Sequence, residues 1–131
     1  MRFFRLFIAL LTLAMLVTST SAVEQRTPKL GSKVENFTLK DYRGKTWSLS
    51  DFKDNKVVVV AFLGTECPLA KLYGRRLGKM ANELESKGVA FIGINSNTQD
   101  SNTEVAAHAR IHEIKSPVLK DLGNKVADQM S

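Results

Sequence analysis

Two short apolar runs dominate the middle of the chain, and a longer amphipathic stretch separates them. Residues 56–63 contain four consecutive valines followed by Ala-Phe-Leu, with no polar alternation. Residues 89–95 form the second run. Short β-branched runs of this kind are typical of strands that are buried on both faces. We therefore expect two parallel strands that are joined by a crossover helix.

The stretch between these runs has the hydrophobic period of an α-helix that ends near residue 87. Pro68 suits its first turn, because the N–H that proline lacks would have no partner there. Gly88 suits its C-terminal end. Interior glycines at 74 and 78 each cost about 1 kcal/mol relative to Ala, which we attribute to close helix-to-sheet packing. Apolar residues at steps of four, four, three and four form one helix face: Leu69, Tyr73, Leu77, Met80 and Leu84.

The segment before residue 56 has the signature of a β-hairpin. Residues 37–40 and 45–49 alternate between apolar and polar side chains, and the turn sequence 41–44 ends in a glycine. We expect Trp47, on the second strand, to lie in or over the core. Ser50 is expected to cap a short helical turn over residues 51–53.

The segment after residue 95 predicts a helix, an extended piece and a final helical turn or two. Residues 101–104 form a capping box, Ser-Asn-Thr-Glu, which begins a helix that runs to about Ile114. Residues 116–121 read as a short extended piece, and residues 123–130 as one or two helical turns. Strands that alternate with helices indicate an α/β fold.

Length and charge narrow the class of protein. A chain of 131 residues holds one domain at most. The formal net charge is +6, but Arg2 and Arg5 belong to an N-terminal leader, and no basic run is longer than Arg75-Arg76. Scattered charges of this kind are typical of solvated faces, so we expect no nucleic-acid partner.

Residues 1–22 have the pattern of a secretory signal peptide. A basic start is followed by an apolar stretch over 6–17 that is too short to span a bilayer comfortably, and then by Thr20-Ser21-Ala22. We expect a signal peptide over 1–22, a linker over 23–30 and a domain over 31–131. The domain would be exported to the periplasm or another extracytoplasmic space, with a possible membrane tether through residues 1–22 if they are not cleaved.

Cys67 is the only cysteine, and it stands where the first apolar run gives way to the helix that begins at Pro68. The free N–H groups and dipole of a helix N-terminus favour a thiolate. Lys71, one turn on, adds positive potential, and Glu66 opposes it. An unpaired thiol in an exported protein is reactive or paired with another molecule. The alternative is that Cys67 is a small buried hydrophobe.

Residues 57–84 resemble the active-site strand and helix of the thioredoxin-like superfamily. The resemblance is closest to the redoxin branch, which includes alkyl hydroperoxide reductase/thiol-specific antioxidant domains and the membrane-side thioredoxins of cytochrome maturation. The entry sequence Phe37-Thr38-Leu39-x-Asp41, a turn, and Ser48-Leu49-Ser50-Asp51-Phe52 is similar to the same pattern. The resemblance implies a thioredoxin-like α/β fold with an N-terminal hairpin and a parallel β-α-β core, and it matches Cys67 to the attacking cysteine.

The resemblance also implies which parts this chain lacks. The family continues with a cis-proline loop, two antiparallel strands and a last helix, and no proline here stands at the cis-proline position. We therefore expect an incomplete domain without these C-terminal elements. A sheet edge would be left unpaired and apolar helix faces uncovered, which favours aggregation.

Two departures from the family pattern bear on chemistry. Dithiol members have a second cysteine where Ala70 stands and a tryptophan where Glu66 stands, so a resolving thiol would have to come from outside this sequence. Peroxiredoxins have a threonine where Gly64 stands and a proline where Val60 stands, and Thr65 is one residue too close to the cysteine. The peroxidase pattern is not met, although a thiolate can still be oxidised to a sulfenic acid.

We therefore expect a thiol redox protein, an oxidoreductase with thiol-disulfide exchange or antioxidant activity. Its catalytic residues would be Cys67, Thr65, Pro68 and Lys71, without a cofactor or metal. Its partners would be an external thiol or disulfide protein, or a peroxide. A degenerate thioredoxin-like binding module is one alternative. A weaker one is copper delivery through Cys67 with His108 and His112, whose i,i+4 spacing can bind a metal, although two solvated helix histidines are the simpler interpretation.

Overall fold

The computed structural model describes residues 30–130, so the predicted signal peptide and all of the predicted linker except Leu30 lie outside the described residues. The strands are β1 (Thr38–Asp41), β2 (Thr46–Ser48), β3 (Val57–Phe62), β4 (Val89–Asn95) and β5 (Val118–Lys120). The helices are the 3-10 turn η1 (Leu49–Phe52), α2 (Pro68–Glu85), α3 (Asn102–Ile111) and α4 (Lys125–Gln129). The strands form one sheet in the order β2-β1-β5-β4-β3.

The N-terminal hairpin is confirmed. Strand β1 pairs antiparallel with β2, and Gly44 has the positive φ of 85° that its turn requires. The expected cap at Ser50 is wrong, because η1 begins after Ser48. The Ser48 N–H donates to Asp51 Oδ2 at 2.8 Å, which satisfies the entrance of this turn two residues earlier than expected. Trp47 is half-buried and stacks on Phe52, so it covers the core as predicted.

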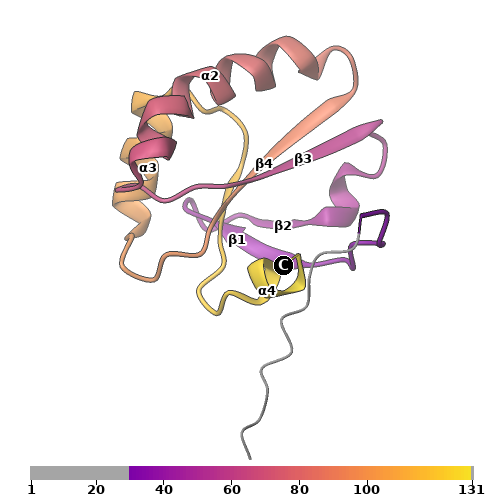
Figure 1. The fold of residues 1–131 in the computed structure, drawn as a ribbon, viewed down its shortest axis with the longest axis horizontal. Helices are drawn as coiled ribbons and strands as arrows, with labels where there is room; N and C mark the ends of the chain where they lie inside the picture. The colour runs from indigo at the N-terminus through magenta and orange to yellow at the C-terminus, as the bar shows by residue number, and fades with distance from the viewer. Residues whose placement is uncertain (1–29, 131) are drawn as a thin grey trace, which may run out of the picture.

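The parallel β-α-β core is also confirmed. Strands β3 and β4 pair in parallel through six residue pairs, and α2 makes the crossover between them. Strand β5 adds to the other side of β4 in parallel and pairs antiparallel with β1, which joins the hairpin to the core (Figure 1). The carboxyl ends of β3, β4 and β5 therefore meet at one end of the sheet.

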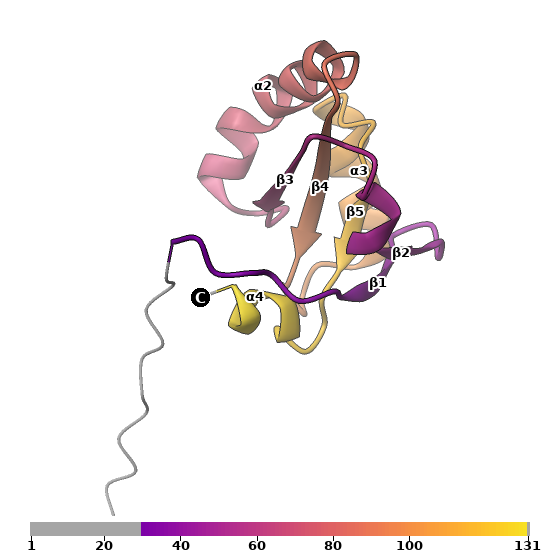
Figure 2. The ribbon, with the colours of Figure 1, turned by 90° about the vertical axis from the view of Figure 1, so that its right-hand side faces the viewer.

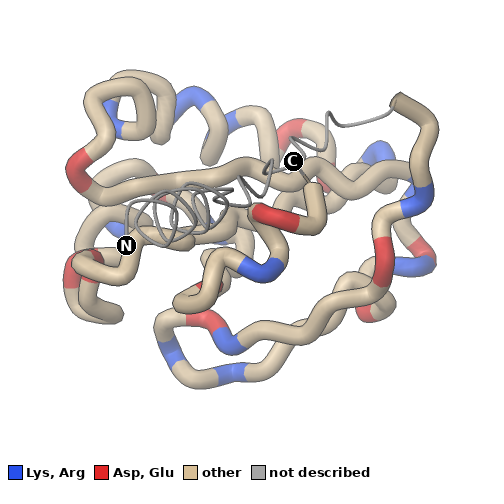
Figure 3. Tube along the Cα trace, turned by 60° about the horizontal axis from the view of Figure 1, so that its bottom comes forward, with Lys and Arg blue, Asp and Glu red and all other residues tan. Residues whose placement is uncertain are grey.

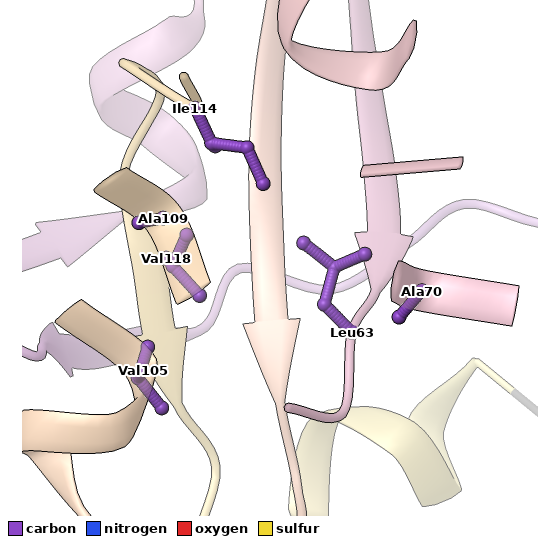
Figure 4. Packing of buried hydrophobic residues seen from close by; sticks show 6 residues of the cluster. All are labelled: Leu63, Ala70, Val105, Ala109, Ile114 and Val118. Carbon is purple, nitrogen blue, oxygen red and sulfur yellow. The ribbon is translucent and has the colours of Figure 1, made fainter. Parts of the chain in front are cut away.

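Two apolar clusters hold the helices to the sheet. One cluster joins the start of α2 to α3, and Figure 4 shows Leu63 beside β4, with Ala70 on one side and the residues from α3, β5 and the loop between them on the other. The second cluster involves α4 and the entry segment, and in Figures 1 and 2 α4 lies well away from α2 and α3. The first comprises Leu63, Ala70, Val105, Ala109, Ile114 and Val118, and the second comprises Phe37, Ile92, Ile94, Leu119 and Val126.

Strand β3 is an edge strand, and it is less buried than expected: Val58, Val60 and Ala61 pack against the two apolar clusters but are only half-buried. Among the described strands it pairs only with β4. Val57 and Phe62 at its two ends are 51% and 48% exposed. Within residues 30–130, the apolar run of β3 therefore has no neighbouring strand along its outer edge.

Helix α2 packs through small residues rather than through its large apolar ones. Leu69 is 64% exposed, and the residues of α2 that are buried are Ala70, Gly74 and Gly78. A Cβ on Gly74 would lie 2.7 Å from Cγ of His112, and a Cβ on Gly78 would lie 2.8 Å from the His112 carbonyl oxygen. The close approach is thus made to the end of α3, and the predicted helix-to-sheet contact at these glycines is wrong.

The surface carries charges of both signs. Figure 3 shows acidic and basic residues interspersed along the chain. No helix within residues 30–130 combines the length and the apolar character that crossing a bilayer requires.

Candidate active site around Cys67

Cys67 lies at the end of a tight loop between β3 and α2. It is the N-cap residue of α2 in an extended conformation, with Pro68 as the first helical residue. Its N–H donates to the carbonyl of Gly64 at 3.2 Å, which closes a turn over residues 64–67. Its side chain makes no capping hydrogen bond, and the residue is exposed. The sulfur is therefore open to solvent at the positive end of the helix dipole.

The two charges that the sequence places beside Cys67 pair with each other. Lys71 Nζ lies 2.8 Å from Glu66 Oε2, and both side chains are at least half exposed. An exposed pair of this kind contributes about 0–1 kcal/mol to stability. The positive charge of Lys71 is thus largely balanced by Glu66 next to the thiol.

Thr65 lies on the buried side of the same loop. It is 7% exposed, and its N–H donates to Asp100 Oδ2 at 2.8 Å. Pro68, by contrast, is exposed at the start of α2. The four predicted site residues are therefore neighbours along the loop and first turn, but Thr65 is directed into the protein while the other three lie at the surface.

A buried carboxylate lies beneath this loop. Asp100 is 5% exposed and follows β4. Besides the Thr65 N–H, its carboxylate accepts from Asn95 Nδ2 at 2.6 Å and from Asn97 Nδ2 at 2.8 Å. The Asn95 amide also donates to the carbonyl of Leu63 at 2.9 Å. Both residues that flank Gly64 in the loop are thus held by side chains from the end of β4 and the loop after it.

Lys120, at the end of β5, completes this network. Its Nζ donates to Asn95 Oδ1 at 2.6 Å and to the carbonyls of Asn97 and Asp100 at 2.9 and 2.7 Å. Burial lowers the pKa of Lys120, against the effect of the Asp100 charge. Burial by itself would raise the pKa of Asp100, but hydrogen bonds from Thr65 and Asn95 and the charge of Lys120 hold it below its ordinary value. The side chains of Asp100, Asn95 and Lys120 therefore form one closely hydrogen-bonded network.

Asn95, Asp100 and Lys120 were not predicted from the sequence as site residues. A signal was present, because Asn95 and Lys120 stand at the carboxyl ends of two apolar strands. Parallel strands that share a sheet bring such ends together, and this is where α/β proteins place functional groups. Only the order of the strands in the sheet, with β4 between β3 and β5, shows that Asn95 and Lys120 lie near the loop before Cys67.

The two histidines of α3 do not form the solvated pair that the sequence suggests. His108 is buried, and its Nε2 has no hydrogen-bond partner in the described part of the protein. Its ring centroid lies 4.4 Å from that of His112, which is half-buried. Burial, and then the neighbouring His112, lower the pKa of His108. Within residues 30–130 no group of three or more His, Cys, Asp or Glu residues could hold a metal ion.

A parallel β-α-β core with a cysteine at the start of its crossover helix defines a thioredoxin-like protein. Residues 30–131 match the AhpC/TSA family, and the chain belongs to this family. The predicted redoxin membership and the predicted thioredoxin-like α/β fold are confirmed.

Known relatives are thiol redox proteins. The chain is 34% identical over 96 residues to a chloroplastic peroxiredoxin Q of Triticum aestivum, a match that covers 73% of this chain and 43% of the relative. It is 31% identical over 98 residues to the thiol-disulfide oxidoreductase ResA of Bacillus subtilis, covering 75% and 53%. A hypothetical protein of Sinorhizobium meliloti has a similar structure, with a TM-score of 0.72, 31% identity, and coverage of 77% and 58%. The chain thus spans about half the length of the curated relatives that it matches.

Proposed function

We propose that the protein is an extracytoplasmic thiol redox protein whose reacting group is Cys67. The observation that carries the proposal is the exposed thiol at the N-cap of α2, in a chain of the AhpC/TSA family. The thiol at this position is exposed at the start of the helix and is open to attack a bond in another molecule.

Thiol-disulfide exchange is the reaction that the site supports best. The Cys67 thiolate attacks one sulfur of a substrate disulfide, a new S–S bond forms, the old one breaks, and the released thiolate takes up a proton. The sequence contains no second cysteine to attack the mixed disulfide. A thiol from outside this sequence must therefore do so, which returns Cys67 to its reduced form and leaves that thiol oxidised.

Reaction with a peroxide is the second candidate, and the kinship with peroxiredoxin Q favours it. The sulfur would attack one peroxide oxygen, the O–O bond would break, and the leaving oxygen would need a proton as Cys67 became a sulfenic acid. External thiols would then reduce the sulfenic acid to regenerate Cys67. Thr65 faces inward and Lys71 is paired with Glu66, so neither is free to assist the leaving oxygen. The described groups around the thiol therefore suit disulfide exchange better.

Export is the part of the proposal that rests on the sequence of residues 1–22. If the segment is a cleaved signal peptide, the protein isolated from an extracytoplasmic fraction should begin at Val23. A protein that keeps Met1 and remains in the membrane fraction would point to an uncleaved tether instead. Recovery in the cytoplasmic fraction alone would contradict export.

The proposed reaction is tested with the full chain and two defined oxidants. The wild-type protein and Cys67→Ser are incubated separately with oxidised glutathione and with hydrogen peroxide, and the adducts are identified by mass spectrometry. We expect a glutathione mixed disulfide on Cys67 that forms more readily than its sulfenic acid, and neither adduct in the variant. If the folded protein forms neither adduct while the denatured protein forms both, the thiol is not a redox group and a binding module becomes the better account. Copper binding at micromolar concentration would support copper delivery through Cys67 and the two histidines instead.

A further inference from the structure

We propose that Asp100 is the positioning residue of Cys67: its buried carboxylate fixes the loop that presents the thiol at the start of α2. The inference rests on the proposed redox role of Cys67 and deepens it. The carboxylate of Asp100 bonds to Thr65, Asn95 and Asn97 rather than to Cys67 itself. It acts through Thr65, whose N–H lies in the turn that the Cys67 N–H closes onto Gly64.

The carboxylate is the centre on which three segments converge. Its two oxygens accept from the loop before Cys67 through Thr65, from the end of β4 through Asn95, and from the following loop through Asn97. Hydrogen bonds to a buried carboxylate are stronger than neutral ones. The loop before Cys67 is thus held by the end of β4, a strand with neighbours on both sides, and not only by the edge strand β3.

Asn95 and Lys120 hold the carboxylate in place. Lys120 has three ammonium protons and three acceptors, one of which is the backbone carbonyl of Asp100. Asn95 donates to both Asp100 and Leu63 while it accepts from Lys120. Because these donors and acceptors are matched, a rearrangement of Asp100 would leave several buried polar groups without partners.

The substitution Asp100→Asn keeps the size and shape of the side chain but removes its ability to accept all three hydrogen bonds. An asparagine has one oxygen acceptor and an NH₂ donor, so it cannot accept from three donors that approach two oxygens. At least one of Thr65, Asn95 and Asn97 would face another donor. Removal of the negative charge also leaves Glu104 as the remaining acidic group whose charge acts on Lys120. We therefore expect the loop to be released in this variant even if the fold is retained.

Asp121→Asn is the matched control. Asp121 is also buried, and its carboxylate accepts from the backbone N–H groups of Lys125, Val126 and Ala127 and from Ser96 Oγ. Its side chain caps α4 and bonds to Ser96, away from the loop before Cys67. Both variants remove one buried charge of comparable bonding, so both should be destabilised, but only Asp100→Asn should change the behaviour of the loop.

The test combines amide hydrogen exchange at Thr65 with the rate at which Cys67 forms the mixed disulfide with oxidised glutathione. In the wild-type protein the Thr65 amide should exchange more slowly than that of Glu66. In Asp100→Asn the Thr65 amide should exchange at least about tenfold faster, a factor equivalent to 1.4 kcal/mol, and hydrogen bonds to charged groups are worth at least about that much. In the same variant, the rate at which Cys67 reacts with oxidised glutathione should move towards the rate of a peptide of residues 64–71. Asp121→Asn should leave both the Thr65 exchange rate and the Cys67 reaction rate unchanged.

Two outcomes would overturn the proposal. One is fast exchange of the Thr65 amide in the wild-type protein, a result that needs no variant to fold. The other, where wild-type Cys67 reacts faster than the peptide, is an Asp100→Asn protein whose Cys67 rate changes no more than that of Asp121→Asn. If wild-type Cys67 reacts no faster than the peptide while the Thr65 amide is protected and released as expected, the redox proposal fails but the holding of the loop by Asp100 stands.

Discussion

Substitution of Gly78 by alanine separates the effect of tertiary packing from that of helix propensity, because the two predict changes of opposite sign in the free energy of unfolding. Gly78 lies in the interior of α2, where alanine is favoured over glycine by about 1 kcal/mol. An added Cβ, however, would lie 2.8 Å from the carbonyl oxygen of His112 and 3.0 Å from that of Glu113. These are backbone atoms, so they cannot move aside by a change of rotamer.

The backbone that faces Gly78 is fixed. Glu113 has a positive φ of 55°. Its N–H donates to the carbonyl of Arg110, and the N–H of Ile114 donates to the carbonyl of Ala109, so the segment is held on either side. Overpacking of a close contact typically costs about 1–3 kcal/mol. After the gain in helix propensity is subtracted, we expect Gly78→Ala to lower the free energy of unfolding by about 1 kcal/mol. In a domain of this size that lowers the thermal midpoint by roughly 4–8 °C.

Thermal and urea unfolding, followed by circular dichroism, measure this effect. Asn82→Ala is the control, because Asn82 is an exposed residue of the same helix and its replacement should be neutral or slightly stabilising. A Gly78→Ala protein that is more stable than wild type by about 1 kcal/mol would show that propensity alone governs this position. The packing of α2 against the end of α3 would then be wrong.

Two further predictions concern charge. Since burial lowers the pKa of His108 below its ordinary 6.5, the unfolded chain takes up a proton before the folded one as the pH falls. The free energy of unfolding should therefore decrease as the pH falls through 6.5, and urea titrations of His108→Gln should show a flatter pH dependence; an unchanged slope would contradict this. At low salt, Lys71→Met should slow the reaction of Cys67 with the anionic oxidised glutathione, and Glu66→Gln should accelerate it, because each variant unbalances the pair beside the thiol. Both effects should shrink at high salt, and rates that are indifferent to salt would indicate that the pair does not act on the reaction.

The elements that sequence predicted well are those fixed by local chemistry. Strand β4 has the bounds expected from its apolar run. The capping box at the start of α3 is present, with the Ser101 N–H donating to Glu104 Oε2 at 2.7 Å and the Glu104 N–H donating to Ser101 Oγ at 3.2 Å. Such signals lie within a few residues of one another, so the pattern alone is enough to find them.

The features that sequence missed depend on contacts between distant segments. The exposure of β3 is decided by the presence or absence of a neighbouring strand, which an apolar run cannot reveal. The partner of Gly78 is the end of α3, more than thirty residues further along the chain. For the candidate site, the position of Cys67 was predictable from the strand, the proline and the helical period. The hydrogen bond from Thr65 to Asp100 was not predictable, because the two residues are 35 positions apart in the sequence.

The most direct test of the account is the rate at which Cys67 attacks a disulfide in the folded protein. The second-order rate with oxidised glutathione at neutral pH should be measured for the full chain and for a peptide of residues 64–71, which has the same neighbours but no folded helix. If the start of α2 and its supported loop activate the thiol, the folded protein will react several-fold faster than the peptide. A folded protein that reacts at the peptide's rate or more slowly, although Cys67 is exposed, would contradict the assignment of Cys67 as the redox group.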